Sequence, residues 1–238
     1  MLGPKATEIR QMFTAIAPRY DFLNHLLSLN IDRMWRRKAV QKLGNAFKDE
    51  TALCLDLCCG TGDLSFAMKT RGSARVIGSD FSHSMLLLHQ RKVRQQSLQA
   101  GILLVEADAL SLPFRSNSFA ALAIAFGLRN LESVNHGLAE MYRVLKPGGR
   151  LVVLEFSRVT IPLLERLFQF YFLQILPRIG ALFSKHPFAY SYLPDSVLKF
   201  PDQEQLKSLF LQNGFKNVSY ENLSVGIAAI HYGEKPGN

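Results

Sequence analysis

Apolar residues follow two different repeats along the chain, and the change between them falls near residue 50. In residues 7–43 the apolar side chains recur every three or four positions, which is typical of amphipathic helices, and Pro18 interrupts this pattern. From residue 52 onward, short apolar runs alternate with helical segments. We therefore expect two or three short N-terminal helices, followed by an α/β domain that contains a parallel sheet.

The apolar runs and the residues that flank them predict the order of the strands and helices. Strands are expected over residues 52–57, 75–80, 102–106, 119–126 and 150–156. Helices are expected over residues 64–69, 85–96, 134–145 and 202–211, with Ser82 and Asp202 as N-caps of the second and the last. Residues 218–223 and 226–232 predict an antiparallel pair of strands at the end of the chain.

The whole chain, residues 1–238, is interpreted as one domain with two additions. Residues 1–45 are expected to form a helical cap at the N-terminus. Residues 159–198 depart from the alternation of strands and helices, and we interpret them as an apolar insertion between the fifth strand and the last helix. Insertions of this kind are where a fold gains its specificity.

Charge and cysteine content limit the partners of the chain. Lys and Arg number 28 against 19 Asp and Glu, so the net charge of +9 favours an anionic partner, either a nucleic acid or an anionic lipid surface. The three cysteines, Cys54, Cys58 and Cys59, lie in one short stretch. Neither a disulfide framework nor a spaced cysteine pair for a metal is present, and no metal site is expected.

The sequence does not predict a secreted or membrane-spanning protein. The N-terminus lacks the apolar core of a secretory signal. Glu165, Arg166 and Arg178 interrupt the most apolar region, residues 159–183, before it reaches the length of a membrane span. We therefore expect a cytoplasmic protein in a reducing compartment.

A glycine-rich turn, residues 58–63 (CCGTGD), follows the first predicted strand. Gly60 and Gly62 allow the backbone to approach a ligand closely, and the next helix points its N-terminus at that ligand. The turn matches neither the dinucleotide fingerprint nor the P-loop. Asp63 would repel a pyrophosphate, so a neutral or cationic ligand is favoured; a tight turn without a ligand is the alternative.

Acidic residues follow the ends of the first predicted strands. Asp80 ends the second strand, where a carboxylate accepts hydrogen bonds from ribose hydroxyls, and Asp108 follows the third, where it can accept from an adenine amine. Asp56 either supports a ligand ammonium group or only braces the turn. A ligand with an adenosine end and a positive centre matches S-adenosylmethionine.

Further blocks of sequence resemble the menaquinone/ubiquinone C-methyltransferases, the UbiE/MenG family of class I methyltransferases. Residues 20–35 (YDFLNHLLSLNIDRMW) resemble the first signature of the family, and residues 143–157 (RVLKPGGRLVVLEFS) resemble the second. Residues 126–130 (FGLRN) and the C-terminal tail also fit. Leu23, Asp32 and Ala125 depart from the usual pattern, and Ala125 removes one side-chain contact to the cofactor.

The resemblance implies a Rossmann-like class I methyltransferase fold, with a seven-stranded, mostly parallel sheet, a C-terminal antiparallel hairpin and N-terminal helices. It implies S-adenosyl-L-methionine as cofactor and places Thr61 and Ala109, besides Asp80 and Asp108, at cofactor-binding positions. The predicted cofactor-binding set is Asp56, Gly60, Thr61, Gly62, Asp80, Asp108 and Ala109. The resemblance also places Tyr20, Arg129 and Asn130 near the substrate ring, as the predicted catalytic set.

The family reaction transfers a methyl group to a ring carbon of a polyprenylated quinol. An oxidised ring is electrophilic, so the nucleophile must be the reduced quinol, and a cation or hydrogen-bond donor near the ring oxygen would stabilise its phenolate. We assign Arg129 to charge stabilisation, Asn130 to orientation of the ring oxygen, and Tyr20 to hydrogen bonding or stacking. Alternatively, Arg129 pairs with Glu132 in an ordinary loop and Tyr20 is a core aromatic residue.

Histidines are further candidates for a general base, because imidazole titrates near neutral pH. The candidates are His25, His136 and His231. His136 is expected on the surface of its helix.

The apolar part of the insertion, residues 159–183, has three interpretations. It lines a channel for the isoprenoid tail, lies on the inner face of the cell membrane as part of a transient peripheral association, or packs on the core.

We expect methylation of demethylmenaquinol, with the benzoquinol intermediate of ubiquinone biosynthesis as the alternative. A nucleic-acid methyltransferase is disfavoured because the sequence has no RNA-binding module and no motif for a flipped base. A non-catalytic binding subunit would predict damage in the glycine-rich turn or at Asp80, and neither is damaged. A homo-oligomer is compatible with the sequence.

Overall fold

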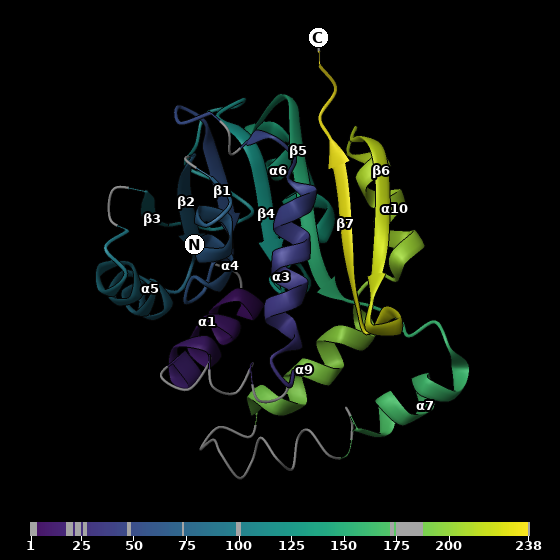
Figure 1. The fold of residues 1–238 in the computed structure, drawn as a ribbon. Coiled ribbons are helices and arrows are strands. Elements are labelled where there is room, and N and C mark those ends of the chain that lie inside the picture. Colours follow the sequence, from purple (N-terminus) through teal and green to yellow (C-terminus); the bar gives the residue numbers. More distant parts are fainter. Residues whose placement is uncertain are drawn as a thin grey trace.

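The computed structural model describes residues 4–17, 21, 25, 28–46, 49–72, 74–98, 101–171, 174 and 188–237. Among these residues, the α-helices are α1 (Pro4–Ile16), α3 (Ile31–Lys42), α4 (Asp63–Lys69), α5 (His83–Gln95), α6 (Val134–Val144), α7 (Pro162–Phe170), α9 (Phe188–Lys199) and α10 (Gln203–Gln212). The strands are β1 (Leu53–Leu57), β2 (Arg75–Asp80), β3 (Ile102–Glu106), β4 (Phe119–Ala125), β5 (Leu145–Phe156), β6 (Lys216–Leu223) and β7 (Ala228–Glu234). Figure 1 shows their arrangement.

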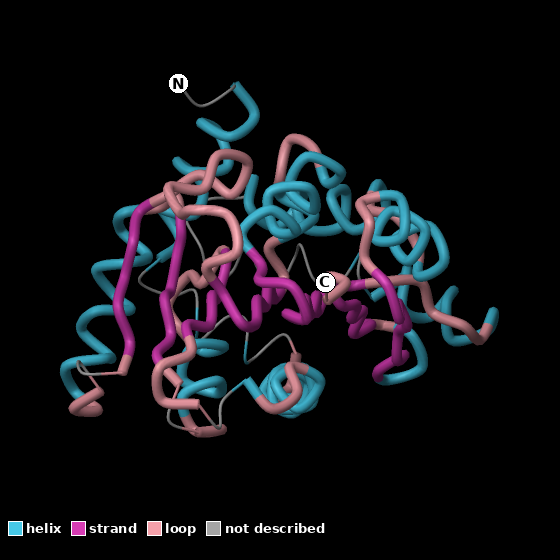
Figure 2. Tube along the Cα trace, turned by 90° about the horizontal axis from the view of Figure 1, so that it is seen from above, coloured by secondary structure: helices cyan, strands magenta, loops and turns pink. Residues whose placement is uncertain are grey.

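The seven strands form one sheet in the order β3-β2-β1-β4-β5-β7-β6. Strands β1 to β5 pair in parallel, whereas β7 is antiparallel to both of its neighbours. Helices lie on both faces of the sheet (Figure 2). The predicted fold class, a mostly parallel seven-stranded sheet with an antiparallel hairpin at the C-terminus, is confirmed.

Each face of the sheet carries its own apolar core, which explains why the central strands are apolar on both sides. On one face, Trp35 and Val40 of α3 and Met68 of α4 pack against residues of β1, β2, β4 and β5. On the other face, Met141 of α6 and Phe210 of α10 pack against the remaining strand residues. The central strands β1, β4 and β5 are therefore mostly buried between two helical layers, which leaves their ends for contact with a ligand.

Two predicted boundaries are wrong in an informative way. The fifth strand begins at Leu145 instead of residue 150, because Leu145 already pairs with Phe119 of β4; the register then shifts across residues 146–149, where Gly148 has a φ of 74°. The preceding helix accordingly ends at Val144. Ser82 is the N-cap residue of α5, as expected, but its side chain makes no capping hydrogen bond.

The reversal of strand order places the ends of β1 and β4 side by side, and such a switch point is where open α/β sheets bind ligands. Helices α1 and α9 lie beyond this carboxyl edge of the sheet, while the C-terminus lies at the opposite edge (Figure 1). Both helices come from the two segments that the sequence pattern separates from the regular alternation. The additions to the fold thus meet at the ligand-binding edge.

The N-cap of α10 offers a direct test of local stability. Asp202 accepts a hydrogen bond from the Gln205 amide at 2.9 Å, and the Gln205 side chain accepts one from the Asp202 amide at 3.0 Å, which completes a capping box. We predict that Asp202→Ala lowers the free energy of unfolding by about 1 kcal/mol in urea denaturation. Asp195→Ala removes only an exposed ion pair to Lys199 and is the control, with a change of less than about 0.5 kcal/mol.

Candidate active site

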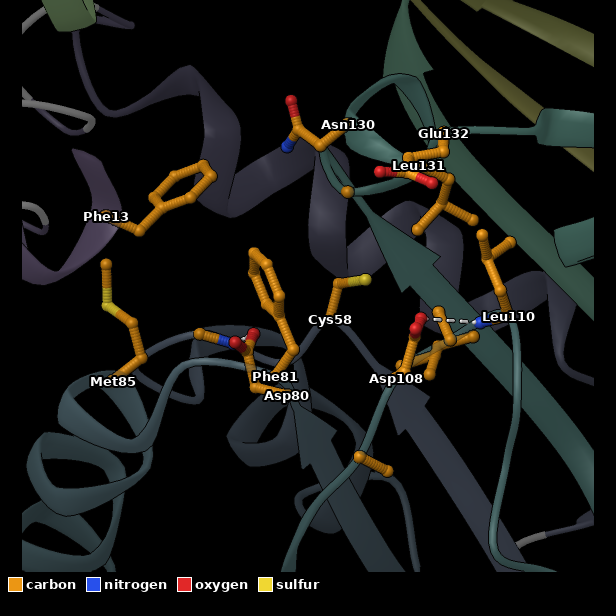
Figure 3. A pocket seen from close by; sticks show the side chains of 15 residues that line it. Phe13, Cys58, Asp80, Phe81, Met85, Asp108, Leu110, Asn130, Leu131 and Glu132 are labelled. Atoms are coloured by element: carbon orange, nitrogen blue, oxygen red, sulfur yellow. Dashed lines mark hydrogen bonds between the residues drawn. The ribbon is translucent and has the colours of Figure 1, made fainter. Parts of the chain in front are cut away.

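A pocket of about 760 Å³, partly open to solvent, lies at the carboxyl ends of the central strands (Figure 3). Its walls come from α1, the glycine-rich turn, the loops after β2, β3 and β4, and α5. The lining residues are Phe13, Leu57, Cys58, Gly60, Asp80, Phe81, Met85, Ala107, Asp108, Ala109, Leu110, Gly127, Asn130, Leu131 and Glu132. Five predicted site residues, Gly60, Asp80, Asp108, Ala109 and Asn130, are therefore brought together.

Asp80 connects two walls of this pocket. Its Oδ2 accepts a hydrogen bond from the Gly60 amide at 2.9 Å, and its Oδ1 accepts one from the Ser82 amide at 2.8 Å. Each carboxylate oxygen keeps a further lone pair for a ligand. Burial raises the pKa of Asp80 to about 6, so the group is ionised near neutral pH but protonates under mildly acidic conditions.

Asp108 approaches the pocket from the loop after β3, where its Oδ1 accepts a hydrogen bond from the Leu110 amide at 2.9 Å (Figure 3). That bond holds the carboxylate in place at the pocket wall. Ala109 and Leu110 follow it along the wall, and Leu131 lines the same pocket from the loop after β4. The combination is an apolar slot with an acid at its edge, which suits a flat aromatic base that carries an amine.

The glycine-rich turn uses its residues for different tasks. Gly60 lines the pocket and has a left-handed backbone, with φ of 51°. Gly62 also has positive φ, but it faces α5, where a Cβ would lie 2.3 Å from the His89 ring. Thr61 is buried, and its hydroxyl donates a hydrogen bond to Asp21 instead of lining the pocket. Gly62 and Thr61 thus stabilise the turn on the side that faces away from the pocket.

Asp56 lies beneath the turn, inside β1. It is buried, and its Oδ2 accepts a hydrogen bond from the Ser65 hydroxyl at 2.5 Å, which ties β1 to α4. Burial raises the pKa of Asp56 to about 7. Since it does not line the pocket, the geometry favours the bracing interpretation over direct contact with a ligand.

Arg129 lies behind the pocket wall. Its guanidinium forms a buried ion pair with Glu155 of β5 at 2.8 Å and donates to the Phe126 carbonyl at 2.6 Å. The alternative pairing with Glu132 is wrong, because the 3-10 turn Leu128–Asn130 directs Arg129 toward the sheet. The role of Arg129 in charge stabilisation stays a prediction, and in this arrangement the charge would act through the adjacent Asn130.

Asn130 faces the pocket, and the inserted segment holds it there. The Tyr192 hydroxyl of α9 donates a hydrogen bond to Asn130 Oδ1 at 3.0 Å, while Asn130 Nδ2 donates to the Phe126 carbonyl at 3.4 Å. Tyr192 belongs to a small apolar cluster that also contains Phe13. The other members of that cluster are Met12, Ile16, Tyr171, Leu193 and Val197. An apolar wall built by the N-terminal cap and the insertion thus reaches the pocket through Phe13.

The remaining candidates are one tyrosine and three histidines, and the described ones among them lie away from this pocket. Tyr20 lies outside the described residues. His136 is exposed on α6, and His231 is buried against the Gln203 carbonyl, where burial lowers its pKa to about 4. His25 contacts Asp32 at 3.0 Å and Asp63 at 3.4 Å. Among the described residues, none of these histidines lines the pocket.

The group formed by His25, Asp32 and Asp63 is the one described cluster with metal-ligand spacing, since its ligand atoms lie within 4.8 Å of one another. Basic side chains already balance the charge of its two carboxylates, because Arg36 pairs with Asp32 and Lys92 pairs with Asp63 at 3.3 Å. The absence of a metal site stays a prediction.

Sequence reasoning missed several lining residues. Cys58 lines the pocket in a left-handed conformation, with φ of 54°, and approaches Gly127 so closely that a Cβ there would lie 2.5 Å from Cys58 Cβ. Gly127 is therefore required where β1 and β4 end side by side. Phe13, Phe81 and Met85 supply apolar surface. An isolated apolar residue carries no pattern that would separate a pocket wall from a core, so no signal identified these three residues.

Comparisons with known proteins agree with this geometry. A model of the ubiE/COQ5 methyltransferase family matches residues 1–235. The chain is 48% identical over 236 residues to the ubiquinone/menaquinone biosynthesis C-methyltransferase UbiE of Geotalea daltonii, covering 98% of this chain and 99% of that protein. It is 46% identical to the demethylmenaquinone methyltransferase of Thermus thermophilus, covering 94% and 100%.

Solved structures with low sequence identity share the fold. The [4+2]-cyclase SpnF has a TM-score of 0.74 at 16% identity and covers 100% of this chain and 99% of its own. The phosphoethanolamine N-methyltransferase 2 of Haemonchus contortus, in complex with S-adenosyl-L-methionine, has a TM-score of 0.60 at 15% identity and covers 84% and 52%. With the pocket at the strand switch point and the match over nearly the whole length, this chain belongs to the ubiE/COQ5 methyltransferase family.

Proposed function

We propose that this protein transfers a methyl group from S-adenosyl-L-methionine to a ring carbon of a polyprenylated quinol, converting demethylmenaquinol to menaquinol. The observation that carries the proposal is the convergence of Asp80, Asp108 and Asn130 on one pocket beside an apolar wall. The names of the relatives, which include both demethylmenaquinone and ubiquinone/menaquinone methyltransferases, support the substrate class.

The residues of the pocket fit the cofactor. Asp80 would accept hydrogen bonds from the ribose hydroxyls, Asp108 would accept one from the adenine amine, and Gly60 allows close approach of the turn. The described lining contains Asp80, Asp108 and Glu132 but no lysine or arginine, so it favours a cationic sulfonium over a phosphate. When bound, the cofactor supplies an electrophilic methyl group.

The protein's own task at the substrate is to hold the ring and stabilise its charge. The quinol must be reduced, because an oxidised ring is not a nucleophile, and its phenolate places negative charge on the ring carbon beside the oxygen. One N–H of the Asn130 amide makes only a long bond to Phe126, and the other is available to donate to that oxygen. Aligning the ring with the methyl group can lower the activation free energy by about 7 to 11 kcal/mol in favourable cases.

The apolar tail of the substrate suggests where the reaction takes place. We place it on the cytoplasmic side, at the inner face of the cell membrane, by transient peripheral association. Among the described helices, none is long and apolar enough to cross a membrane. The clustering of α1 and α9 residues and of Tyr171, which follows α7, around Tyr192 provides an apolar surface next to the pocket, on which the first isoprene units would lie.

The decisive test compares substrates. We expect the purified protein with labelled S-adenosylmethionine to methylate demethylmenaquinol and not its oxidised quinone. Product formation is followed by mass spectrometry. Exclusive turnover of the polyprenyl methoxy-benzoquinol would assign the ubiquinone pathway instead, and failure with both quinols would refute the proposal.

The ionisation of Asp80 generates a second prediction. Since its carboxylate must be charged to accept from the ribose, and its pKa is raised to about 6, the affinity for S-adenosylmethionine should fall as pH drops through 6, by about tenfold per unit below it. We expect Asp80→Asn to weaken binding about a hundredfold and to remove this pH dependence in calorimetry.

A matched control for that measurement is Glu106→Gln. Glu106 ends the neighbouring strand β3 and contacts Arg10 and His83 on the surface, outside the pocket. The variant should bind the cofactor as the wild type does. Equal losses in both variants would show that the effect is not specific to Asp80.

The contact between Tyr192 and Asn130 generates a third prediction. Tyr192→Phe removes the hydroxyl that holds the Asn130 amide, so we expect kcat with the quinol to fall about tenfold while the dissociation constant of S-adenosylmethionine is unchanged. Tyr220→Phe is the control, because that hydroxyl bonds Glu204 on the surface at 2.8 Å. An unchanged kcat in Tyr192→Phe would exclude a positioning role.

A further inference from the structure

Exposed apolar side chains are concentrated on one edge of the molecule. Among the described residues, eight of the twelve exposed large apolar side chains come from three short segments. They are Leu29, Ile31 and Met34 at the start of α3, Val225 in the 3-10 turn Ser224–Gly226 (η5), and Ile161, Leu163, Leu164 and Phe170 in and just before α7. We call these eight residues the apolar strip.

The three segments are adjacent in space, although they are far apart in the sequence. The Trp35 indole of α3 donates to the Ser224 hydroxyl at 3.2 Å, which places α3 beside η5. The Thr160 amide donates to the Val225 carbonyl at 3.0 Å, which places η5 beside the start of α7. Figure 1 shows α7, α9 and the lower end of α3 at the same edge of the molecule. This is the carboxyl edge of the parallel strands, where the pocket lies.

Two turns hold apolar side chains outward with left-handed backbone. Leu29 is 77% exposed with φ of 52°, and Val225 is 43% exposed with φ of 61°. This region is unfavourable for residues other than glycine, most of all for a β-branched one such as valine. Both the left-handed conformation and the exposure of an apolar side chain to water cost free energy. The cost of exposure is recovered only when another apolar surface covers these side chains.

Basic residues border the apolar strip. Arg33 and Arg37 are exposed on α3 beside Met34, and Arg166 is exposed on α7. The acids within these segments are Asp32, which is buried and paired with Arg36, and Glu165. An apolar surface with a cationic border complements an anionic bilayer, where the arginines meet phosphates and the apolar side chains enter the headgroup boundary.

We propose that the apolar strip is the face with which this protein lies on an anionic membrane. The inference rests on the proposed function, because a polyprenylated quinol is itself held in the bilayer. Docking by this edge turns the carboxyl ends of the strands toward the lipid, so the ring would enter the pocket beside the packed α1 and α9 residues while the tail stays in the membrane. The strip thereby determines the orientation of the protein on the membrane.

Vesicle binding of matched leucine variants tests the proposal. We expect the wild type to co-sediment with vesicles of phosphatidylcholine and phosphatidylglycerol more strongly than with phosphatidylcholine alone. Leu29→Ser and Leu163→Ser should each weaken binding about tenfold. Leu211→Ser and Leu87→Ser remove exposed leucines, at 51% and 45%, from α10 and α5, outside the strip, and should leave binding unchanged.

Charge variants test the border separately. Arg33→Gln and Arg37→Gln should each reduce the preference for phosphatidylglycerol by about fivefold and lower its sensitivity to salt. Vesicle binding that is lost equally in the strip and control leucine variants, or in none of them, would overturn the assignment of this face.

Turnover of a short-tailed, water-soluble quinol separates this inference from the proposed function. The strip variants should methylate it as the wild type does, because the strip is outside the pocket. Absence of turnover in the wild type would refute the proposed function, whereas vesicle binding would still decide the docking face. A wild-type dimer in sedimentation velocity that Leu163→Ser dissociates, without vesicle binding, would make the strip an interface between two copies and overturn the proposal.

Discussion

The pocket depends on one buried carboxylate. Asp80 accepts amide hydrogen bonds from the glycine-rich turn after β1 and from the first residues before α5, so it joins two segments that leave different strands. Burial makes the ionised state of this group costly, and the two amides offset part of that cost. The same oxygens remain available to a ligand. Structural support and the proposed recognition of the cofactor therefore use one side chain, so a substitution of Asp80 would affect both.

A chain of polar contacts holds the N-terminal segment in register with this turn. Asp21 accepts from Thr61 and pairs with Lys92 at 2.5 Å, while His25 lies between Asp32 and Asp63. These contacts connect the cap to the glycine-rich turn and to α5. The cap then presents Phe13 to the pocket. In this way the cap adds an apolar wall to the pocket at the carboxyl ends of the strands.

The two additions to the alternating fold meet beside the pocket, on the side proposed for the substrate. Phe13 of α1 and Tyr192 of α9 belong to one apolar cluster, and Tyr192 also holds the Asn130 amide. Arg129 is withdrawn into an ion pair with Glu155 of β5, where its charge is largely balanced. A neutral amide then faces the pocket, with a buried cation behind it. The exposed apolar strip lies at the same edge, so the surfaces proposed for the tail, the ring and the membrane are neighbours.

Local physical rules explain what the sequence by itself determined. Periodicity, the glycine-rich turn and the N-cap at Asp202 predicted the element order and the mostly parallel sheet, because each depends on residues within a few positions. The same rules brought Asp80 and Asp108 to the expected edge, since parallel strands end on one side, whereas Asn130 was expected there from the family resemblance. Only the tertiary structure decided that Arg129 pairs with Glu155, that Thr61 and Gly62 support the turn from behind, and that Tyr192 reaches Asn130. Those contacts join distant segments through packing, which no local pattern records.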